Sequence, residues 1–281
     1  MKCEICFNET KLFFNQNGIL PERCGKCGHI FIKHSDSITG IREEAWGGNG
    51  FFDQFRILLT WMRLKNIKIE ENSNVFEIGY GNGVLLEKFH KKGNKIGGAE
   101  AGLLKNSVPE YLKNNAELYY GDFENLEIPK NKFDLIYGIH LIEHIKDSNA
   151  FLKKCNNLLS KNGKVYFITP NSMSLGARLF KSSWWNFEDP THIQFFNPVS
   201  ARISLMNAGF KEIKTKILLT DSLMVEVNSI LRMLGKKSGK SGVMDSYISK
   251  AAGVFLLPVS LILRILIPAL SPSIEISAVK E

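Results

Sequence analysis

Residues 77–83 read Glu-Ile-Gly-Tyr-Gly-Asn-Gly, the pattern in this chain with the clearest chemical meaning. The glycines at 79, 81 and 83 permit a sharp turn and a close approach of the backbone to a ligand, because no Cβ stands in the way. A dinucleotide fingerprint, G-x-G-x-x-G, would need glycine where Val84 stands. The segment therefore predicts a ligand-binding turn of another kind, with the carboxylate of Glu77 just before it.

Four of the five cysteines form two Cys-x2-Cys pairs near the N-terminus, namely Cys3, Cys6, Cys24 and Cys27. The first residues contain no apolar signal segment, so we expect a cytoplasmic chain whose thiols stay reduced. Two such pairs match a tetrahedral zinc site with four thiolate ligands, in which the metal is structural because every ligand position is filled. Two metal-free thiol pairs, or His29 in place of one cysteine, are the alternatives.

Short apolar runs alternate with helical patterns from residue 74 onward. Such alternation predicts a doubly wound α/β fold with a mostly parallel sheet, whose ligands bind at the carboxyl ends of the strands. Two further strands are expected at 211–219 and 273–279. The predicted organisation is a zinc-ribbon-like segment at 1–33, a linker with an N-terminal helix at 34–73, and a main domain at 74–281 with an insertion at 220–272.

In order and spacing, residues 75–219 resemble the class I S-adenosylmethionine-dependent methyltransferases. Glu100 ends the second expected strand and Asp122-Phe123 follows the third. Three further pieces resemble one subgroup of that family: Glu143-His144, Pro170-Asn171 and the run 189–192, Asp-Pro-Thr-His. Gly97-Gly98 departs from the family, which usually has a bulky residue there, and 161–163 holds one glycine where the family often has two.

The resemblance implies a seven-stranded Rossmann-like sheet and S-adenosylmethionine as the methyl donor. It places Glu100 on the ribose hydroxyls and Asp122 at the adenine amino group. The whole implied donor site comprises Glu77, Gly79, Gly81, Gly83, Glu100, Asp122 and Phe123.

Three histidines are candidate bases for an alcohol acceptor, because histidine titrates near neutral pH. His140 and His144 follow the fourth expected strand. His192 lies in an aromatic stretch after the fifth, and it is the preferred base because Asp189 can orient it. For each of the three, a structural histidine held by hydrogen bonds is the alternative.

The subgroup resemblance favours O-methylation of a glycan, a lipid-linked sugar or a quinone-like small molecule. Exocyclic-amine methylation is disfavoured, since no Asn/Asp-Pro-Pro-aromatic motif follows the fourth expected strand. RNA methylation is the rival activity, supported by the net charge of +8 and the cysteine pairs, although no aromatic–basic interleaving accompanies them. A non-catalytic scaffold that binds S-adenosylmethionine is the third hypothesis.

The insertion combines a basic segment with an apolar one. Residues 228–250 contain five basic residues against the single acid Asp245, and residues 251–270 contain one charge, Arg264, and two prolines. This composition predicts contact of 228–270 with an anionic membrane surface, at the inner face of the membrane. A lid over the main domain and a dimer interface are the alternatives.

Overall fold

The computed structural model describes residues 1–15, 20–32, 51–101, 108–187, 189, 191–235 and 247–281. The linker predicted at 34–50, Pro190, and the lysines at 236, 237 and 240 lie outside these residues. The chain divides into two compact units. The first comprises Met1–Gly40, Thr169–Ile203 and Thr215–Glu275, and the second comprises Ile41–Ile168, Ser204–Lys214 and Ile276–Glu281.

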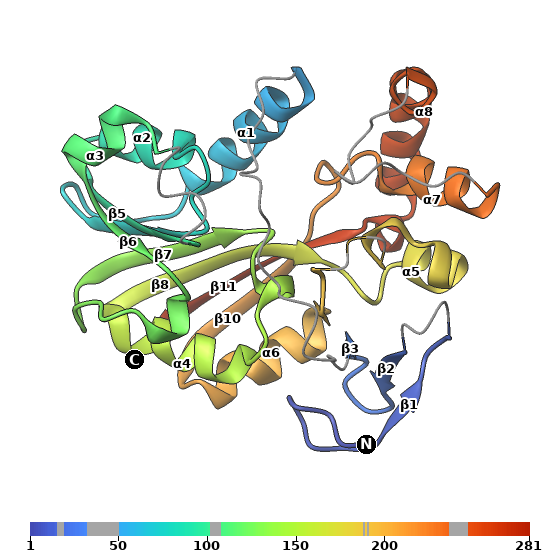
Figure 1. Cartoon of the computed structure of the whole chain (residues 1–281), viewed down its shortest axis with the longest axis horizontal. Coiled ribbons are helices and arrows are strands. Elements are labelled where there is room, and N and C mark those ends of the chain that lie inside the picture. Colours follow the sequence, from blue (N-terminus) through green and yellow to red (C-terminus); the bar gives the residue numbers. More distant parts are fainter. Residues whose placement is uncertain (16–19, 33–50, 102–107, 188, 190, 236–246) are drawn as a thin grey trace. The chain divides into compact units, whose positions relative to one another are not determined.

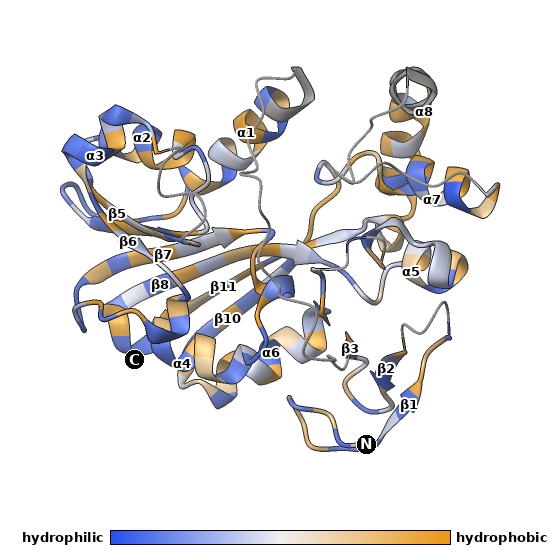
Figure 2. Ribbon diagram, viewed as in Figure 1, coloured by the Kyte–Doolittle hydropathy of each residue, from blue (hydrophilic) through white to orange (hydrophobic). Residues whose placement is uncertain are grey.

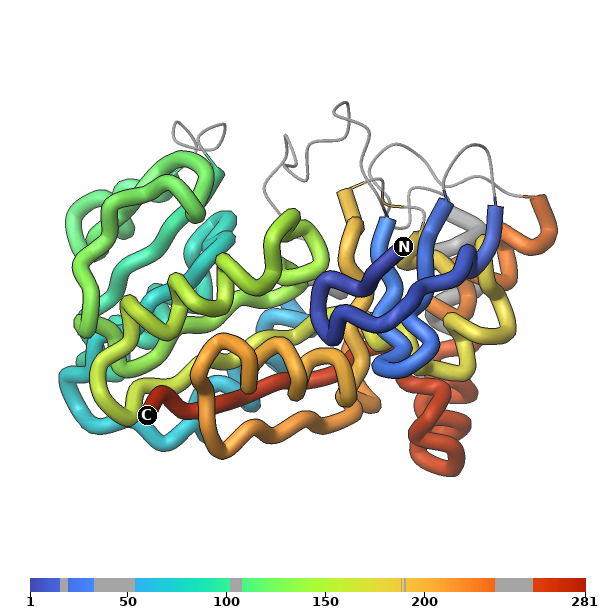
Figure 3. Tube along the Cα trace, turned by 90° about the horizontal axis from the view of Figure 1, so that it is seen from below, coloured from blue at the N-terminus to red at the C-terminus, as the bar shows by residue number. Residues whose placement is uncertain are grey.

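A seven-stranded sheet organises the second unit (Figure 1). Its strands are β4 (Asn74–Ile78), β5 (Lys95–Glu100), β6 (Ala116–Tyr120), β7 (Phe133–Ile139), β8 (Leu159–Pro170), β10 (Phe210–Ile217) and β11 (Ser273–Lys280). Their order is β10-β11-β8-β7-β4-β5-β6, and the β6-β5-β4-β7-β8 neighbours pair in parallel. The red C-terminal strand β11 lies beside β10 in Figure 3. The predicted fold class is confirmed.

The sheet changes its winding direction between β4 and β7. The chain moves outward from β4 to β5 and β6, and then returns to the other side of β4 with β7. In sheets of this type the crevice at such a switch point is where ligands bind. The turn after β4 therefore occupies the position expected for a ligand site.

Helices alternate with the strands, as the pattern from residue 74 onward predicts, and one further helix precedes β4 within the segment 34–73. They are α1 (Phe51–Leu64), α2 (Val84–His90), α3 (Glu110–Asn115), α4 (Ser148–Leu158) and α6 (Pro198–Asn207). Figure 1 shows α2 and α3 on one face of the sheet and α4 on the other. Asp147 caps α4 by accepting a hydrogen bond from the Ala150 N–H at 2.9 Å. Helix α4 ends at Leu158 because β8 begins at Leu159.

The cysteine-rich segment belongs to a small sheet in the first unit. Strands β1 (Thr10–Leu12), β2 (Pro21–Cys24) and β3 (Ile30–Ile32) pair antiparallel, and the fourth strand is β9 (Gln194–Phe195). Ile30 of β3 lies opposite Phe195 of β9. The N-terminal segment therefore completes its sheet with residues more than 160 positions later in the chain.

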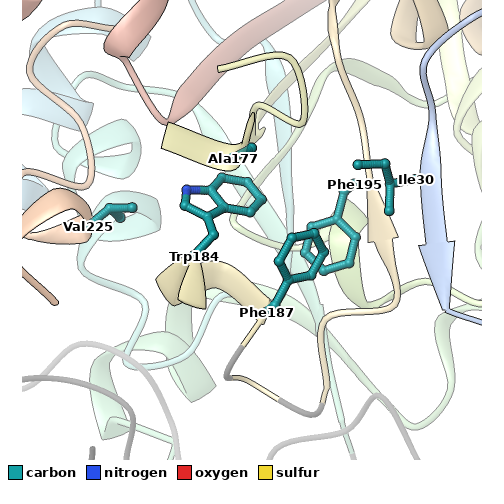
Figure 4. Close-up of a cluster of buried hydrophobic side chains, with 6 residues drawn as sticks. All are labelled: Ile30, Ala177, Trp184, Phe187, Phe195 and Val225. Atoms are coloured by element: carbon teal, nitrogen blue, oxygen red, sulfur yellow. The ribbon is translucent and has the colours of Figure 1, made fainter. Parts of the chain in front are cut away.

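An aromatic core joins these strands to the helices of the first unit: α5 (Leu175–Phe180) and α7 (Val225–Met233). Figure 4 shows Trp184 and Phe187 between β9 and these helices. The buried members of this core are Ile30, Ala177, Trp184, Phe187, Phe195 and Val225. The aromatic stretch at 184–196 thus packs mainly as a core that holds the cysteine-rich strands.

Helix α8 (Tyr247–Leu266) completes the insertion and is followed by a short 3₁₀ turn, Pro268–Leu270. Among the described residues, none of the helices combines the length and the apolar composition required to cross a membrane.

Candidate active site

The glycine-spaced turn after β4 adopts the backbone that its sequence predicts. Gly79, Gly81 and Gly83 all have positive φ angles, of 72°, 54° and 70°. L-residues with a Cβ are strained in this region, so glycine is the natural residue at each position. The Gly81 N–H points at a carboxylate and donates a hydrogen bond to Glu100 Oε2 at 2.7 Å.

The carboxylates of Glu100 and Asp122 lie at the carboxyl ends of β5 and β6. Glu100 also accepts from the Ala101 N–H at 2.8 Å, and burial raises its pKa although both backbone N–H groups oppose the rise. Asp122 caps the 3₁₀ turn Phe123–Asn125 by accepting from the Glu124 N–H at 3.2 Å, and its side chain is exposed. Phe123 is buried. These residues of β5 and β6 thus stand at the same edge of the sheet as the glycine turn.

Glu77, the penultimate residue of strand β4, carries a buried carboxylate. The Tyr137 hydroxyl donates a hydrogen bond to its Oε2 at 2.9 Å. Burial raises the pKa of Glu77 well above its ordinary value, Tyr137 opposes the rise, and the charge of Glu100 adds to it. A cationic ligand group beside Glu77 would favour its ionised form.

The pH dependence of stability tests this environment. The folded donor-free protein holds the Glu77 proton above the ordinary pKa of 4.5, whereas the unfolded chain releases it there. The free energy of unfolding should therefore fall as pH rises from about 4.5, and Glu77→Gln should remove part of this fall. Urea unfolding at several pH values measures both profiles. Parallel profiles for the two proteins would contradict the raised pKa.

Tyr80, between the first two glycines of the turn, explains the unusual Gly97-Gly98 pair. A Cβ on Gly98 would lie 2.6 Å from Tyr80 Cδ1 and 3.0 Å from the Glu77 carbonyl oxygen, and one on Gly97 would lie 3.1 Å from the Phe76 ring. Tyr80 is itself buried. The two rings occupy the volume that a bulky β5 side chain would need, so the departure from the family is a packing compensation.

Gly98→Ala is expected to destabilise the fold by roughly 1–3 kcal/mol, because the added methyl overpacks Tyr80. Gly98 has no positive φ, so crowding rather than backbone strain is tested. Tyr80→Leu in the same chain should relieve part of the loss, giving a double variant more stable than the sum of the single effects. Denaturant unfolding of the four proteins measures this, and strictly additive losses would refute the compensation.

His140 and His144 lie close in sequence to Glu143, whose carboxylate is wholly buried. His140 has a positive φ of 52°, and its Nδ1 lies 3.3 Å from Glu143 Oε1. His144 ends the 3₁₀ turn Ile142–His144 and is half-buried. His140 is thus within hydrogen-bond distance of Glu143. Whether either histidine acts in catalysis stays a prediction.

His192 is buried in the first unit and is held from its Nδ1 side. Nδ1 lies 2.8 Å from the Asn186 carbonyl oxygen, which can only accept a hydrogen bond. This contact assigns the proton to Nδ1 and leaves a lone pair on Nε2. Asp189 Oδ2 lies 3.6 Å from Nε2, and the Thr191 hydroxyl donates to Asp189 at 2.6 Å. The orienting group is therefore Asn186, which the sequence does not reveal, and Asp189 faces the other nitrogen.

The four N-terminal cysteines converge on one point. The Sγ atoms of Cys3 and Cys27 are 3.7 Å apart, those of Cys6 and Cys24 are 3.4 Å apart, and all four lie within 4.8 Å of one another. These distances are far longer than a disulfide bond. A hydrogen bond from Cys27 lowers the pKa of Cys3 to about 5. His29 is not part of the cluster, because its Nε2 lies 2.6 Å from Gln194 Oε1.

The two cysteine loops have matching backbones. Phe7 N–H donates to the Cys3 carbonyl at 2.9 Å, and Gly28 N–H donates to the Cys24 carbonyl at 3.1 Å. Phe7 and Gly28 both have positive φ, of 59° and 68°. The second loop is further fixed by Asn197, whose Nδ2 donates to the Cys27 carbonyl at 3.0 Å. The cluster is thus built from two related turns and anchored to the segment after β9.

The doubly wound sheet, the glycine turn at its switch point and the carboxylates that follow β5 and β6 define an α/β protein of the methyltransferase class. Residues 56–215, more than half of the chain, match the family described as a methyltransferase domain. The chain belongs to this family, as the resemblance implied.

Relatives and solved structures extend this assignment. The ubiquinone biosynthesis O-methyltransferase of Pelagibacter ubique is 29% identical over 156 residues, which cover 50% of this chain and 65% of that protein. The chain thus spans less than two thirds of that relative. Phosphoethanolamine N-methyltransferase 2 of Haemonchus contortus, solved with S-adenosylhomocysteine, has a TM-score of 0.55 at 17% identity, covering 82% of this chain and 53% of that chain. The [4+2]-cyclase SpnF has a TM-score of 0.56 at 14% identity, covering 84% and 86%. At these identities the structures share the fold alone.

Proposed function

We propose that this protein transfers a methyl group from S-adenosylmethionine to a hydroxyl of a quinone-like small molecule. The observation that carries the proposal is the left-handed glycine turn at the switch point, with Glu100 bonded to Gly81. Membership of the methyltransferase family and the name of the Pelagibacter ubique relative support it. A glycan or a lipid-linked sugar is the alternative hydroxyl acceptor.

When bound, S-adenosylmethionine supplies an electrophilic methyl group. The glycine turn offers a backbone surface free of Cβ atoms, and the exposed carboxylate of Asp122 can accept from an amino group. His192 Nε2 would take the proton of the acceptor hydroxyl, which would leave the oxygen able to receive the methyl group that the donor supplies. Asp189 then stabilises the imidazolium ion. Holding the reactants in line supplies much of the remaining rate.

An acceptor screen with methyl-labelled donor tests the proposed activity. The protein is incubated with hydroquinone-type phenols, lipid extract, glycan extract and total RNA, with the Gly81→Val protein as the inactive control. Label on the phenols or on a quinone in the lipid extract is expected. Label only on RNA would establish the rival activity, and donor binding without label in any fraction would favour the scaffold.

We further propose that the four-cysteine cluster binds one structural zinc ion. Four sulfurs at Zn–S distances of about 2.3 Å form a tetrahedron with edges of about 3.8 Å. The two S···S distances of 3.4 and 3.7 Å fit this tetrahedron with little movement. The ribbon is small and has little core of its own, so the metal would contribute a large share of its stability.

Cys24→Ser with Cys27→Ser is expected to abolish zinc binding and to loosen the first unit beyond residues 1–33. Ile32 N–H donates to the Ile193 carbonyl at 2.9 Å, so the ribbon holds the residue next to His192. Turnover should therefore fall while donor affinity stays within about twofold. Elemental analysis, tryptophan fluorescence and calorimetric titration of the donor measure these effects.

Cys155→Ser is the matched control, because this buried cysteine lies on α4 outside the cluster. That variant should retain the metal. Wild-type protein purified without chelator that contains no zinc would exclude the proposal.

A further inference from the structure

Helix α8 is inverted with respect to an ordinary surface helix, because its charged residue faces the protein and its apolar residues face outward. Arg264 is fully buried, and its guanidinium donates to both carboxylate oxygens of Glu226 on α7, at 2.8 and 2.6 Å. It also donates to three backbone carbonyls, those of Leu219, Asp221 and Ser222. Ser260, one turn earlier, lies 3.4 Å from the same carboxylate. The polar side chains of α8, Ser260 and Arg264, therefore face the interior of the first unit and form their polar contacts there.

The remaining described face of α8 exposes a continuous series of apolar side chains. Phe255 is 80% exposed and Leu266 is 71% exposed. The other exposed apolar residues of this face are Leu256, Val259, Ile262, Leu263 and Ile265, and the exposed Ile267 follows the end of the helix. In Figure 2 the described part of α8 is coloured largely as hydrophobic. Contiguous exposed apolar surface of this kind marks an interaction site.

We propose that this face of α8 inserts into the surface of an anionic lipid bilayer. The charge of the neighbouring sequence selects this occupant: the connection between α7 and α8 contains Lys236, Lys237 and Lys240 against the single acid Asp245. Lysines next to an interfacial helix are attracted to anionic headgroups.

Two contributions with different salt dependence follow from this arrangement. Insertion of the apolar side chains removes them from water, and salt does not screen this contribution. Attraction of the lysines to the lipid weakens with ionic strength, because the Debye length shortens. Binding to anionic vesicles should therefore decrease at high salt without vanishing. Binding to purely zwitterionic vesicles should be weak at every salt concentration.

Vesicle co-sedimentation of the full chain tests the proposal, with vesicles of phosphatidylcholine alone or mixed with phosphatidylglycerol. Phe255→Ser with Leu266→Ser should lower the partition coefficient about tenfold or more. The matched control is Leu12→Ser with Met206→Ser, two apolar residues that are 57% and 59% exposed on β1 and α6. This control pair should change partitioning less than about twofold. Thermal unfolding verifies that both variants stay folded.

Three outcomes would overturn the proposal. The first is intact protein that does not sediment with anionic vesicles at low salt. The second is equal loss of binding in both variant pairs. The third is a dimer, detected by light scattering, that Phe255→Ser with Leu266→Ser dissociates while vesicle binding is absent, which would assign the face to a second copy of the chain.

Discussion

Replacing His192 with alanine is expected to lower turnover by about two to four orders of magnitude and to leave donor affinity unchanged. The contact from Nδ1 to the Asn186 carbonyl fixes the ring and keeps the lone pair on Nε2. In the proposed mechanism, removing the imidazole eliminates the group that takes the acceptor proton, whereas the proposed donor-site residues lie on β4 and β5 and in the turns after β4 and β6. Single-turnover rates and calorimetric titration of the donor measure the two quantities separately.

His144→Ala is the comparison that decides the assignment. If that variant loses turnover and His192→Ala does not, the base is His144. A purely structural role for His192 predicts a lower unfolding temperature with normal turnover of the folded fraction.

Gly81→Val is expected to abolish measurable donor binding in a protein that still folds. Gly81 has a φ of 54°, which a β-branched residue adopts only with strain, and its N–H holds Glu100. A valine side chain would also stand on the backbone surface offered to the donor. Calorimetric titration with S-adenosylmethionine gives the affinity, and circular dichroism verifies the fold.

Gly93→Val is the control for backbone strain alone. Gly93 also has a positive φ, of 85°, but a Cβ there would meet no atom within 4 Å. Both variants should lose stability, roughly 1–2 kcal/mol for the left-handed backbone. Only the Gly81 variant should lose donor binding. Equal donor affinity in the two variants would show that the turn after β4 is not the donor site.

Local pattern was sufficient to predict the sheet and the sharp glycine turn after β4. The strands of the second unit are short apolar runs bounded by glycines and polar residues. Helix caps such as Asp147 form hydrogen bonds with residues only three positions away. Glycine at positions 79, 81 and 83 permits the positive φ angles that the turn adopts there. These features depend on interactions close in sequence, which a single chain reveals without a structure.

Local sequence pattern could not predict how side chains of neighbouring strands and turns pack against one another. The Gly97-Gly98 pair is a departure from the family when read along the sequence, and only the position of the Tyr80 and Phe76 rings makes it a compensation. The orienting contact of His192 likewise comes from the carbonyl of Asn186, a backbone group that carries no sequence signal. Both effects depend on which atoms the fold brings into contact.

The sequence by itself determined the methyltransferase class, the succession of strands along the chain from β4 to β8 and the pairing of cysteines into two turns. Only the tertiary structure decided that the ribbon completes its sheet with β9, and that α8 turns its charged stripe inward toward Glu226. A hydrophobic pattern reveals that a helix has two faces, but not which face is covered. That choice is made by the buried ion pair with a residue 38 positions away, a contact that no local periodicity contains.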